Sequence, residues 1–297
     1  MRWMTVPLAD GRELDVVASE RPEGMGVLFH HGTPGNATRY ESWFAAAEAR
    51  GLRPVAYSRP GCATSTRDAG RSVASAVPDV AAVLDMLGID EFVSIGGSGG
   101  GPHVIACAAL LPGRCLAAAA LVTVAPWGAA GLDWFAGMTQ SNVEEFSAAL
   151  AGEAELRAWM AANGEDFRHV TGENLLDAMA GMLDPVDQAV ITGEWADHEA
   201  AGMRRALEHG FDGWVDDDLA FTQPWGFDVE TISTPVHVWQ GELDQLVPWS
   251  HGKWLGEHIP GATFRLAEGH GHFSLGVANR DEIFDELLAA AAAGTQG

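Results

Sequence analysis

Positive charge is scarce in this chain. Of its 297 residues, 17 are Lys or Arg, and Lys253 is the single lysine. Against them stand 41 Asp and Glu, which leaves a formal net charge of −24. A surface this acidic repels the phosphates of nucleic acids and the headgroups of anionic membranes. We therefore expect neither as a partner, and we expect a small-molecule substrate instead. The oligomeric state is left open.

Cysteines are also few, and long apolar runs are missing. Cys62, Cys107 and Cys115 are too few, and odd in number, for a disulfide framework. No apolar run approaches the length of a membrane span, and the first residues lack the apolar core of a signal peptide. With 47% hydrophobic and 20% charged residues, the chain can bury a core. We expect a soluble, cytoplasmic protein.

Strand-like apolar runs alternate with helical patterns up to residue 127 and again from residue 231. Such alternation predicts right-handed crossovers and an α/β fold with a mostly parallel sheet of about eight strands, covered by helices on both faces. The predicted strands are 2–8, 13–18, 26–30, 53–57, 92–95, 116–124, 235–240 and 262–266. The predicted helices are 39–50, 73–87, one ending at 111, 249–258 and a closing one around 283–288.

Residues 128–230 have a different character. They hold 21 acidic and 4 basic residues, so −17 of the total charge falls here. This range shows no convincing strand, but several amphipathic helical stretches, including 142–150, 153–162, 173–182 and 197–209. We predict a core domain formed by 1–127 and 231–297, and a helical acidic cap subdomain formed by 128–230. Near its start, the candidate substrate contacts are Trp127, Trp134 and Phe135, although burial in the subdomain's own core is the commoner use of such residues.

Ser98 lies in Gly96-Gly97-Ser98-Gly99-Gly100, directly after a buried apolar run and before a helix start. A strand, a tight turn and a helix would hold the serine in a strained backbone conformation and lift its hydroxyl clear of the sheet. A phosphate-binding loop is the competing interpretation, but no Lys-Ser/Thr follows the glycines. Because a glycine-rich chain can produce this pattern by chance, the rest of the sequence must decide.

Four polar features follow apolar strands, at the ends where reactive groups gather in open α/β sheets. They are the loop His31-Gly32-Thr33-Pro34-Gly35, then Ser98, Asp244 and His272. The order Ser…Asp…His is the one expected for a nucleophile elbow on such a sheet. Glu242 is an alternative to Asp244. The neighbouring histidines could instead bind a metal, but no third ligand is evident, so we expect no metal and no cofactor.

Together these motifs resemble those of α/β-hydrolases with a helical cap, a family that includes proline iminopeptidases, esterases and non-haem perhydrolases. The resemblance spans essentially the whole chain. It implies Ser98 as nucleophile, His272 as general base and Asp244 as the acid that orients the base. The match to a Gly-His-x-Ser pattern at Gly271–Ser274 favours His272 over His270.

The resemblance also implies an oxyanion hole formed by the backbone N–H groups of Thr33 and Gly99. Gly99 departs from the family, because proline iminopeptidases usually carry tryptophan after the serine and perhydrolases usually carry methionine. We therefore expect a roomier pocket beside Ser98, with substrate choice resting on the cap.

The predicted activity is hydrolysis of a small, fairly apolar carboxylic ester. An aminopeptidase for proline-like N-termini is the second choice. Acyl transfer, lyase chemistry and ligand binding without turnover remain open, because the motifs indicate a reaction type and not a substrate.

Overall fold

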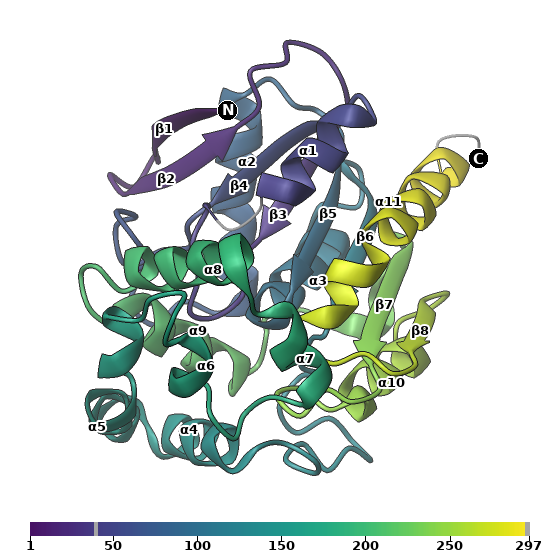
Figure 1. The fold of residues 1–297 in the computed structure, drawn as a ribbon. Helices are drawn as coiled ribbons and strands as arrows, with labels where there is room; N and C mark the ends of the chain where they lie inside the picture. Colours follow the sequence, from purple (N-terminus) through teal and green to yellow (C-terminus); the bar gives the residue numbers. More distant parts are fainter. Residues whose placement is uncertain (39–40, 295–297) are drawn as a thin grey trace.

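The computed structural model describes residues 1–38 and 41–294, and within them an eight-stranded sheet forms the centre of the molecule (Figure 1). Its strand order is β1-β2-β4-β3-β5-β6-β7-β8. The first two pairings are antiparallel and all others are parallel, which confirms the predicted mostly parallel sheet. The strands are β1 (Arg2–Pro7), β2 (Glu13–Ala18), β3 (Gly26–His30), β4 (Arg53–Tyr57), β5 (Phe92–Gly97), β6 (Cys115–Leu121), β7 (Val236–Gly241) and β8 (Thr263–Ala267).

Helices cover both faces of the sheet because its central strands are apolar on both sides. In β3, Leu28 belongs to one core cluster, whereas Val27 and Phe29 belong to the other. The first cluster includes side chains of α2 (Ala76–Met86), α3 (Gly101–Leu110) and α10 (Trp249–His258), and the second includes side chains of α1 (Glu41–Ala49) and α11 (Ser274–Gly294). The predicted helix 39–50 corresponds to α1, and its first two residues lie outside the described residues.

Phe29 shows how the second cluster is held together. Its ring centroid lies 5.2 Å from that of Phe44 in α1 and 6.4 Å from that of Phe284 in α11. Burial of one such side chain stabilises a fold by about 1.5–3 kcal/mol. One strand residue therefore ties together two helices that lie far apart in the sequence.

Residues 128–230, called the helical insertion from here on, contain helices and no strand among the residues described. The helices are α4 (Gln140–Ala151), α5 (Glu153–Asn163), α6 (Leu175–Ala178), α7 (Pro185–Val190), α8 (Gly193–Ala206) and α9 (Asp212–Phe221). The predicted stretch 173–182 yields only the single turn of α6, and Gly181 has a positive φ of 77° that a continuing helix does not allow. Two helices, α7 and α9, were not among the predicted stretches.

The helical insertion contributes its own small apolar clusters, one around Leu156, Met160 and Trp214 and one around Val170, Ala196 and Ala200. Side chains from α4, α8 and α9 line the same pocket as residues at the carboxyl ends of β3 and β5. The insertion therefore lies over the edge of the sheet where the predicted reactive residues gather. Among the described residues, no helix has both the length and the apolar character needed to cross a membrane.

Candidate active site

Ser98 lies on the sharp turn between β5 and α3. Its φ is 55°, in the left-handed region that non-glycine residues seldom adopt, as expected for a nucleophile elbow. The flanking glycines are required by the backbone of β3. A Cβ added at Gly96 would lie 2.7 Å from the carbonyl oxygen of His30, and one added at Gly100 would lie 2.8 Å from its carbonyl carbon. The turn therefore forms only where both positions lack a side chain.

His272 and Asp244, predicted from separate loops, lie in contact. His272 Nδ1 donates a hydrogen bond of 2.8 Å to Asp244 Oδ2, while Asp244 Oδ1 accepts 2.9 Å hydrogen bonds from the backbone N–H groups of Leu246 and Val247. Burial raises the pKa of Asp244 above its usual value, although the neighbouring His272 acts in the opposite direction. With Nδ1 as donor, the neutral imidazole presents Nε2 as a base.

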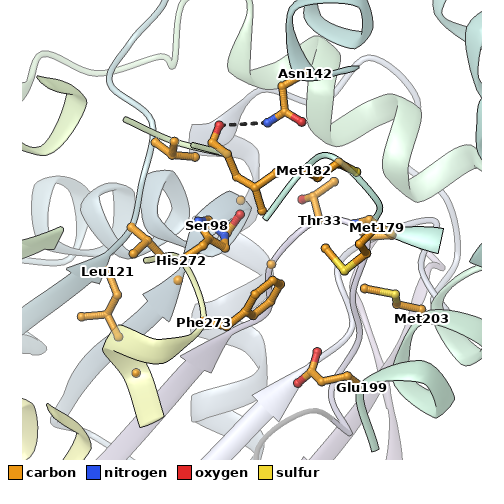
Figure 2. Close-up of a pocket in the computed structure, with 18 of the residues that line it drawn as sticks. Thr33, Ser98, Leu121, Asn142, Met179, Met182, Glu199, Met203, His272 and Phe273 are labelled. Atoms are coloured by element: carbon orange, nitrogen blue, oxygen red, sulfur yellow. Dashed lines mark hydrogen bonds between the residues drawn. The ribbon is translucent and has the colours of Figure 1, made fainter. Parts of the chain in front are cut away.

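Ser98 and His272 both line one pocket, and Figure 2 shows them in the same part of it. The rival residues lie elsewhere. Neither His270 nor Glu242 is among the described residues that line this pocket, and the exposed Glu242 accepts a 2.9 Å hydrogen bond from the N–H of Gly269. The structure therefore places Ser98 and His272 on one pocket and bonds the third favoured side chain, Asp244, to His272.

Thr33 and Gly99, the two residues predicted to supply backbone N–H groups, are immediate neighbours on the pocket wall. A Cβ added at Gly99 would overlap Thr33 Oγ1 and would lie 2.8 Å from Thr33 Cβ and 3.1 Å from Phe221 Cζ. The expectation of extra room beside Ser98 is therefore wrong. The threonine side chain and a phenylalanine of α9 occupy the space that a larger residue at position 99 would need.

Arg59, which the sequence did not single out, holds the loop that carries Thr33. Its side chain is fully buried, and it donates to the carbonyl oxygens of His31 (2.5 Å) and Gly32 (3.0 Å) and to Thr33 Oγ1 (3.0 Å). His31 contributes to the same brace, because its Nε2 accepts from the N–H of Arg59 at 2.9 Å. Burial, and then the adjacent Arg59, hold the pKa of His31 well below its usual value, so this imidazole is neutral.

Asp217 in α9 balances the charge of Arg59. Its carboxylate is 0% exposed and accepts from Arg59 Nη2 at 2.6 Å, Arg71 Nη2 at 2.5 Å and Thr33 Oγ1 at 2.6 Å. Burial alone would raise the pKa of Asp217, but the two guanidinium groups outweigh it and hold the pKa well below the usual range. An ionised carboxylate of the helical insertion is therefore part of the structure behind the predicted oxyanion hole.

The pocket has a volume of about 710 Å³, and 19 of the 40 residues that line it belong to the helical insertion (Figure 2). Methionine and aromatic side chains make up nine of the insertion's 19 lining residues. Such side chains form an adaptable apolar surface. The residues are Phe146, Trp159, Phe167, Met179, Met182, Trp195, Met203, Trp214 and Phe221.

Four carboxyl groups interrupt this apolar wall, those of Glu145, Glu194, Glu199 and Asp218. Glu145 of α4 and Asp218 of α9 are buried, line the pocket and are hydrogen-bonded to each other. Burial raises the pKa of Glu145 to about 7 and that of Asp218 well above its usual value. Glu145 Oε1 also accepts a 2.6 Å hydrogen bond from the indole N–H of Trp214. A hydrogen bond between two carboxyl groups needs a proton on one of them, so the pair carries at most one negative charge while that bond is kept.

The three predicted substrate contacts lie elsewhere. Trp127, Trp134 and Phe135 are not among the described residues that line the pocket. Instead they pack against one another with ring centroids 5.4–5.5 Å apart, and the indole N–H of Trp134 donates to the carbonyl oxygen of Ala125 at 2.8 Å. They belong to the packing between the insertion and the core, so their predicted contact with substrate is not supported.

No group of three His, Cys, Asp or Glu side chains suited to a metal ion occurs in the part of the chain that the structure describes. The neighbouring histidines have separate environments. His30 stacks on His103 at 6.3 Å between ring centroids, whereas His31 braces the Thr33 loop and His272 bonds Asp244.

Comparison with known proteins gives relatives that match over nearly the full length of this chain. It is 28% identical over 297 residues to a non-heme chloroperoxidase of Streptomyces lividans, which covers 96% of this chain and 98% of that protein. It is 26% identical over 266 residues to a bifunctional esterase/perhydrolase of Acinetobacter calcoaceticus, covering 89% and 90%. It is also 26% identical over 309 residues to a proline iminopeptidase of Neisseria gonorrhoeae, covering 91% and 92%.

Among solved structures, a bromoperoxidase from Bacillus anthracis superposes with a TM-score of 0.70 at 19% identity, over 98% of this chain and 100% of that one. At that identity the likeness shows the fold alone. A family model described as alpha/beta hydrolase fold matches residues 27–278, a range that includes the serine turn, the acid loop and the histidine loop. The chain therefore belongs to the alpha/beta hydrolase family.

Proposed function

We propose that this protein is a serine hydrolase that cleaves a small, fairly apolar carboxylic ester through an acyl-enzyme. The observation that carries the proposal is that Ser98, on its strained turn, and His272, which is hydrogen-bonded to Asp244, line one pocket. A serine hydroxyl becomes a competent nucleophile only when a base can take its proton. His272, which lines the same pocket as Ser98, is that base in the proposal.

In the proposed reaction, His272 Nε2 takes the proton of Ser98 as Oγ attacks the ester carbonyl carbon. The backbone N–H groups of Thr33 and Gly99 stabilise the oxyanion that forms. His272 then passes its proton to the leaving alcohol, which departs as the acyl-enzyme is formed. Water repeats the sequence and releases the acid. Asp244 keeps Nδ1 protonated and stabilises the imidazolium.

The preference for an apolar ester rests on the methionine and aromatic wall of the pocket. We propose that the helical insertion acts as the cap of this family, since it supplies most of that wall. The named esterase/perhydrolase relative supports the ester reaction. Gly99 still differs from the methionine that perhydrolases of the family usually carry, so we place hydrolysis ahead of perhydrolysis.

The Glu145–Asp218 pair favours a second candidate, an aminopeptidase that binds a cationic N-terminus. A buried pair with one negative charge can compensate an ammonium group in an apolar pocket. One relative is named proline iminopeptidase, which agrees with this alternative. An ester without an amine has no positive charge for the Glu145–Asp218 pair to compensate.

Two experiments test the proposal. The first is labelling of the folded protein with a fluorophosphonate and location of the adduct by mass spectrometry, with Ser98→Ala as the blank. We expect one adduct, on Ser98. Absence of an adduct, while a control hydrolase is labelled, would remove the acyl-enzyme and favour ligand binding without turnover.

The second experiment is a hydrolysis screen of acyl esters of graded chain length against aminoacyl amides, prolyl amide included. Turnover of esters alone supports the first candidate. Preference for amino-terminal amides, with a KM raised by Glu145→Gln for amides and not for esters, supports the second.

A further inference from the structure

Asp187 belongs to the helical insertion, yet its side chain makes contacts with the loop that carries His272. It lies in α7, which Figure 1 shows beside the first turn of α11. Another residue, Asp184, caps α7 by accepting from the N–H of Val186 at 3.0 Å. The carboxylate of Asp187 is therefore not used by its own helix. The residue is 2% exposed, so its partners must come from the protein.

Four donors of the histidine loop surround this carboxylate. Oδ2 accepts from the backbone N–H of His272 at 2.6 Å. Oδ1 accepts from the N–H of Phe273 at 3.0 Å, and from the N–H and the hydroxyl of Ser274 at 2.9 Å each. The Ser274 hydroxyl in turn accepts from the N–H of Gly271 at 2.8 Å. Every residue of this loop from 271 to 274 is therefore bonded directly or through Ser274 to Asp187.

These contacts occupy the start of α11, a helix of 21 residues whose first N–H groups have no partner within the helix. A carboxylate is favoured there by the helix dipole as well as by the hydrogen bonds. The fit is close, because a Cβ added at Gly271 would lie 2.6 Å from Asp187 Cγ and 2.7 Å from its Oδ1. The loop has room for Asp187 only because residue 271 is glycine.

His272 is therefore held at two points by two different parts of the chain. Asp244, after β7 of the core, bonds the imidazole, whereas Asp187, in the insertion, bonds the backbone N–H. The bond from the imidazole to Asp244 fixes the orientation of the ring. The bond from the backbone N–H to Asp187 fixes the position of the backbone that carries the ring. A misplacement of about 1 Å in a reacting group can lower a rate by roughly 10²-fold.

We propose that Asp187 is a positioning residue for the catalytic base: the helical insertion sets the location of His272 through the backbone of residues 272–274. The inference rests on the proposed role of His272. It makes the docking of α7 a condition for an aligned triad, so that the insertion is part of the catalytic apparatus and not only a wall of the pocket.

The test compares Asp187→Asn with Asp184→Ala as the matched control. The first keeps the shape of the side chain but turns an acceptor into a donor facing N–H groups, and the second weakens the same helix without touching the histidine loop. The first measurement is the second-order rate of fluorophosphonate labelling at Ser98. The second is the downfield NMR resonance of the proton between His272 and Asp244, which needs no substrate and is assigned by its loss in His272→Ala.

We expect Asp187→Asn to lower the labelling rate by roughly 10²-fold and to shift or broaden the downfield resonance, while Asp184→Ala changes neither. Equal labelling rates and an unchanged resonance in folded Asp187→Asn would overturn the proposal. So would equal losses in both variants, since Asp187 would then act only through the stability of α7.

Two further results distinguish a failure of the positioning role of Asp187 from a failure of the proposed function. If the wild type is not labelled at all, the proposed function fails, and the NMR comparison alone decides the positioning role. If Asp187→Asn does not fold, Ser274→Ala removes two of the hydrogen bonds from the core side. We expect a smaller change in the same direction, and no change would count against the proposal.

Discussion

The two loops that form the proposed machinery are both tied to a buried aspartate of the helical insertion, but by different chemistry. At the loop of residues 31–35, Asp217 faces the guanidinium groups of Arg59 and Arg71. At the loop of residues 271–274, Asp187 faces backbone N–H groups and one hydroxyl. The first tie is a balance of full charges, whereas the second is a set of directed hydrogen bonds.

This difference indicates what each loop depends on. Removing one partner of a buried ion pair leaves an uncompensated charge and costs about 3–5 kcal/mol. Removing one acceptor from neutral donors costs about 1–3 kcal/mol for each buried group left unsatisfied. The loop at Thr33 should therefore be sensitive to charge, and the loop at His272 should be sensitive to geometry. The following variants test that contrast.

Asp217→Ala should have the largest effect on stability. It leaves two buried guanidinium groups without their shared carboxylate, and we expect the free energy of unfolding to fall by about 3–5 kcal/mol or more. The measurement is urea denaturation followed by circular dichroism. Asp216→Ala is the control in the same helix, because Asp216 pairs with the partly exposed Arg67, which can turn to water. Equal losses in the two variants would contradict the charge-balance interpretation.

Gly99→Ala should disturb the proposed oxyanion hole and lower the rate of acyl-enzyme formation. The new Cβ overlaps Thr33 Oγ1, so the Thr33 loop must move, and loss of one oxyanion donor typically lowers a rate by about 10²–10³-fold. Gly97→Ala is the matched control, since its Cβ would have no heavy atom closer than 3.6 Å among those it meets. The fluorophosphonate labelling rate distinguishes the two. A Gly99→Ala protein labelled as fast as Gly97→Ala would show that the contact is harmless.

Glu145→Gln should change the pH dependence of stability. The pKa of Glu145 is raised from 4.5 to about 7 in the fold, so the folded state keeps a proton that the unfolded state loses. Wild-type stability attributable to this group is thus full below pH 4.5 and is lost as pH rises toward 7. At about 1.4 kcal/mol per pKa unit, the loss is on the order of 1–3 kcal/mol.

Glutamine does not titrate, so the advantage of wild type over Glu145→Gln should shrink from pH 5 to pH 8. Thermal melts of both proteins across this range measure it. The neighbouring Glu144, which is exposed in α4, supplies the control variant Glu144→Gln, whose curve should run parallel to that of wild type. Parallel curves for Glu145→Gln would mean that Glu145 holds no extra proton.

Glu153→Ala should have the smallest effect. Glu153 is about half exposed and pairs with Arg67 and Arg157 at the surface of the insertion. Exposed ion pairs of this kind contribute about 0.2–1 kcal/mol, and salt screens them. A urea titration at low and at high salt measures the difference. A loss comparable to that of Asp217→Ala would show that the acidic surface, and not its buried members, stabilises the insertion.

The residues and helices that could be predicted from the sequence are those with a local motif or a clear periodicity. Ser98, Asp244 and His272 could be chosen because each lies in a local motif at the end of an apolar strand, and parallel strands bring such ends together. The helices α7 and α9 offered no comparable signal. The first has six residues and begins at a proline, and the second carries Asp216, Asp217 and Asp218 in a row, a pattern typical of a solvated surface.

The sequence by itself determined the strand alternation, the acidic helical insertion, and the three residues of the proposed triad, since these depend on local periodicity and short motifs. Only the tertiary structure decided that Gly99 leaves no free space, that Trp134 packs away from the pocket, and that Asp187 and Asp217 contact the two loops of the core. The contacts of Asp187 and Asp217 with these two loops join residues 85–184 positions apart. Burial reverses the meaning of an acidic residue, because a carboxylate inside the fold needs partners that its own neighbours in the chain do not reveal.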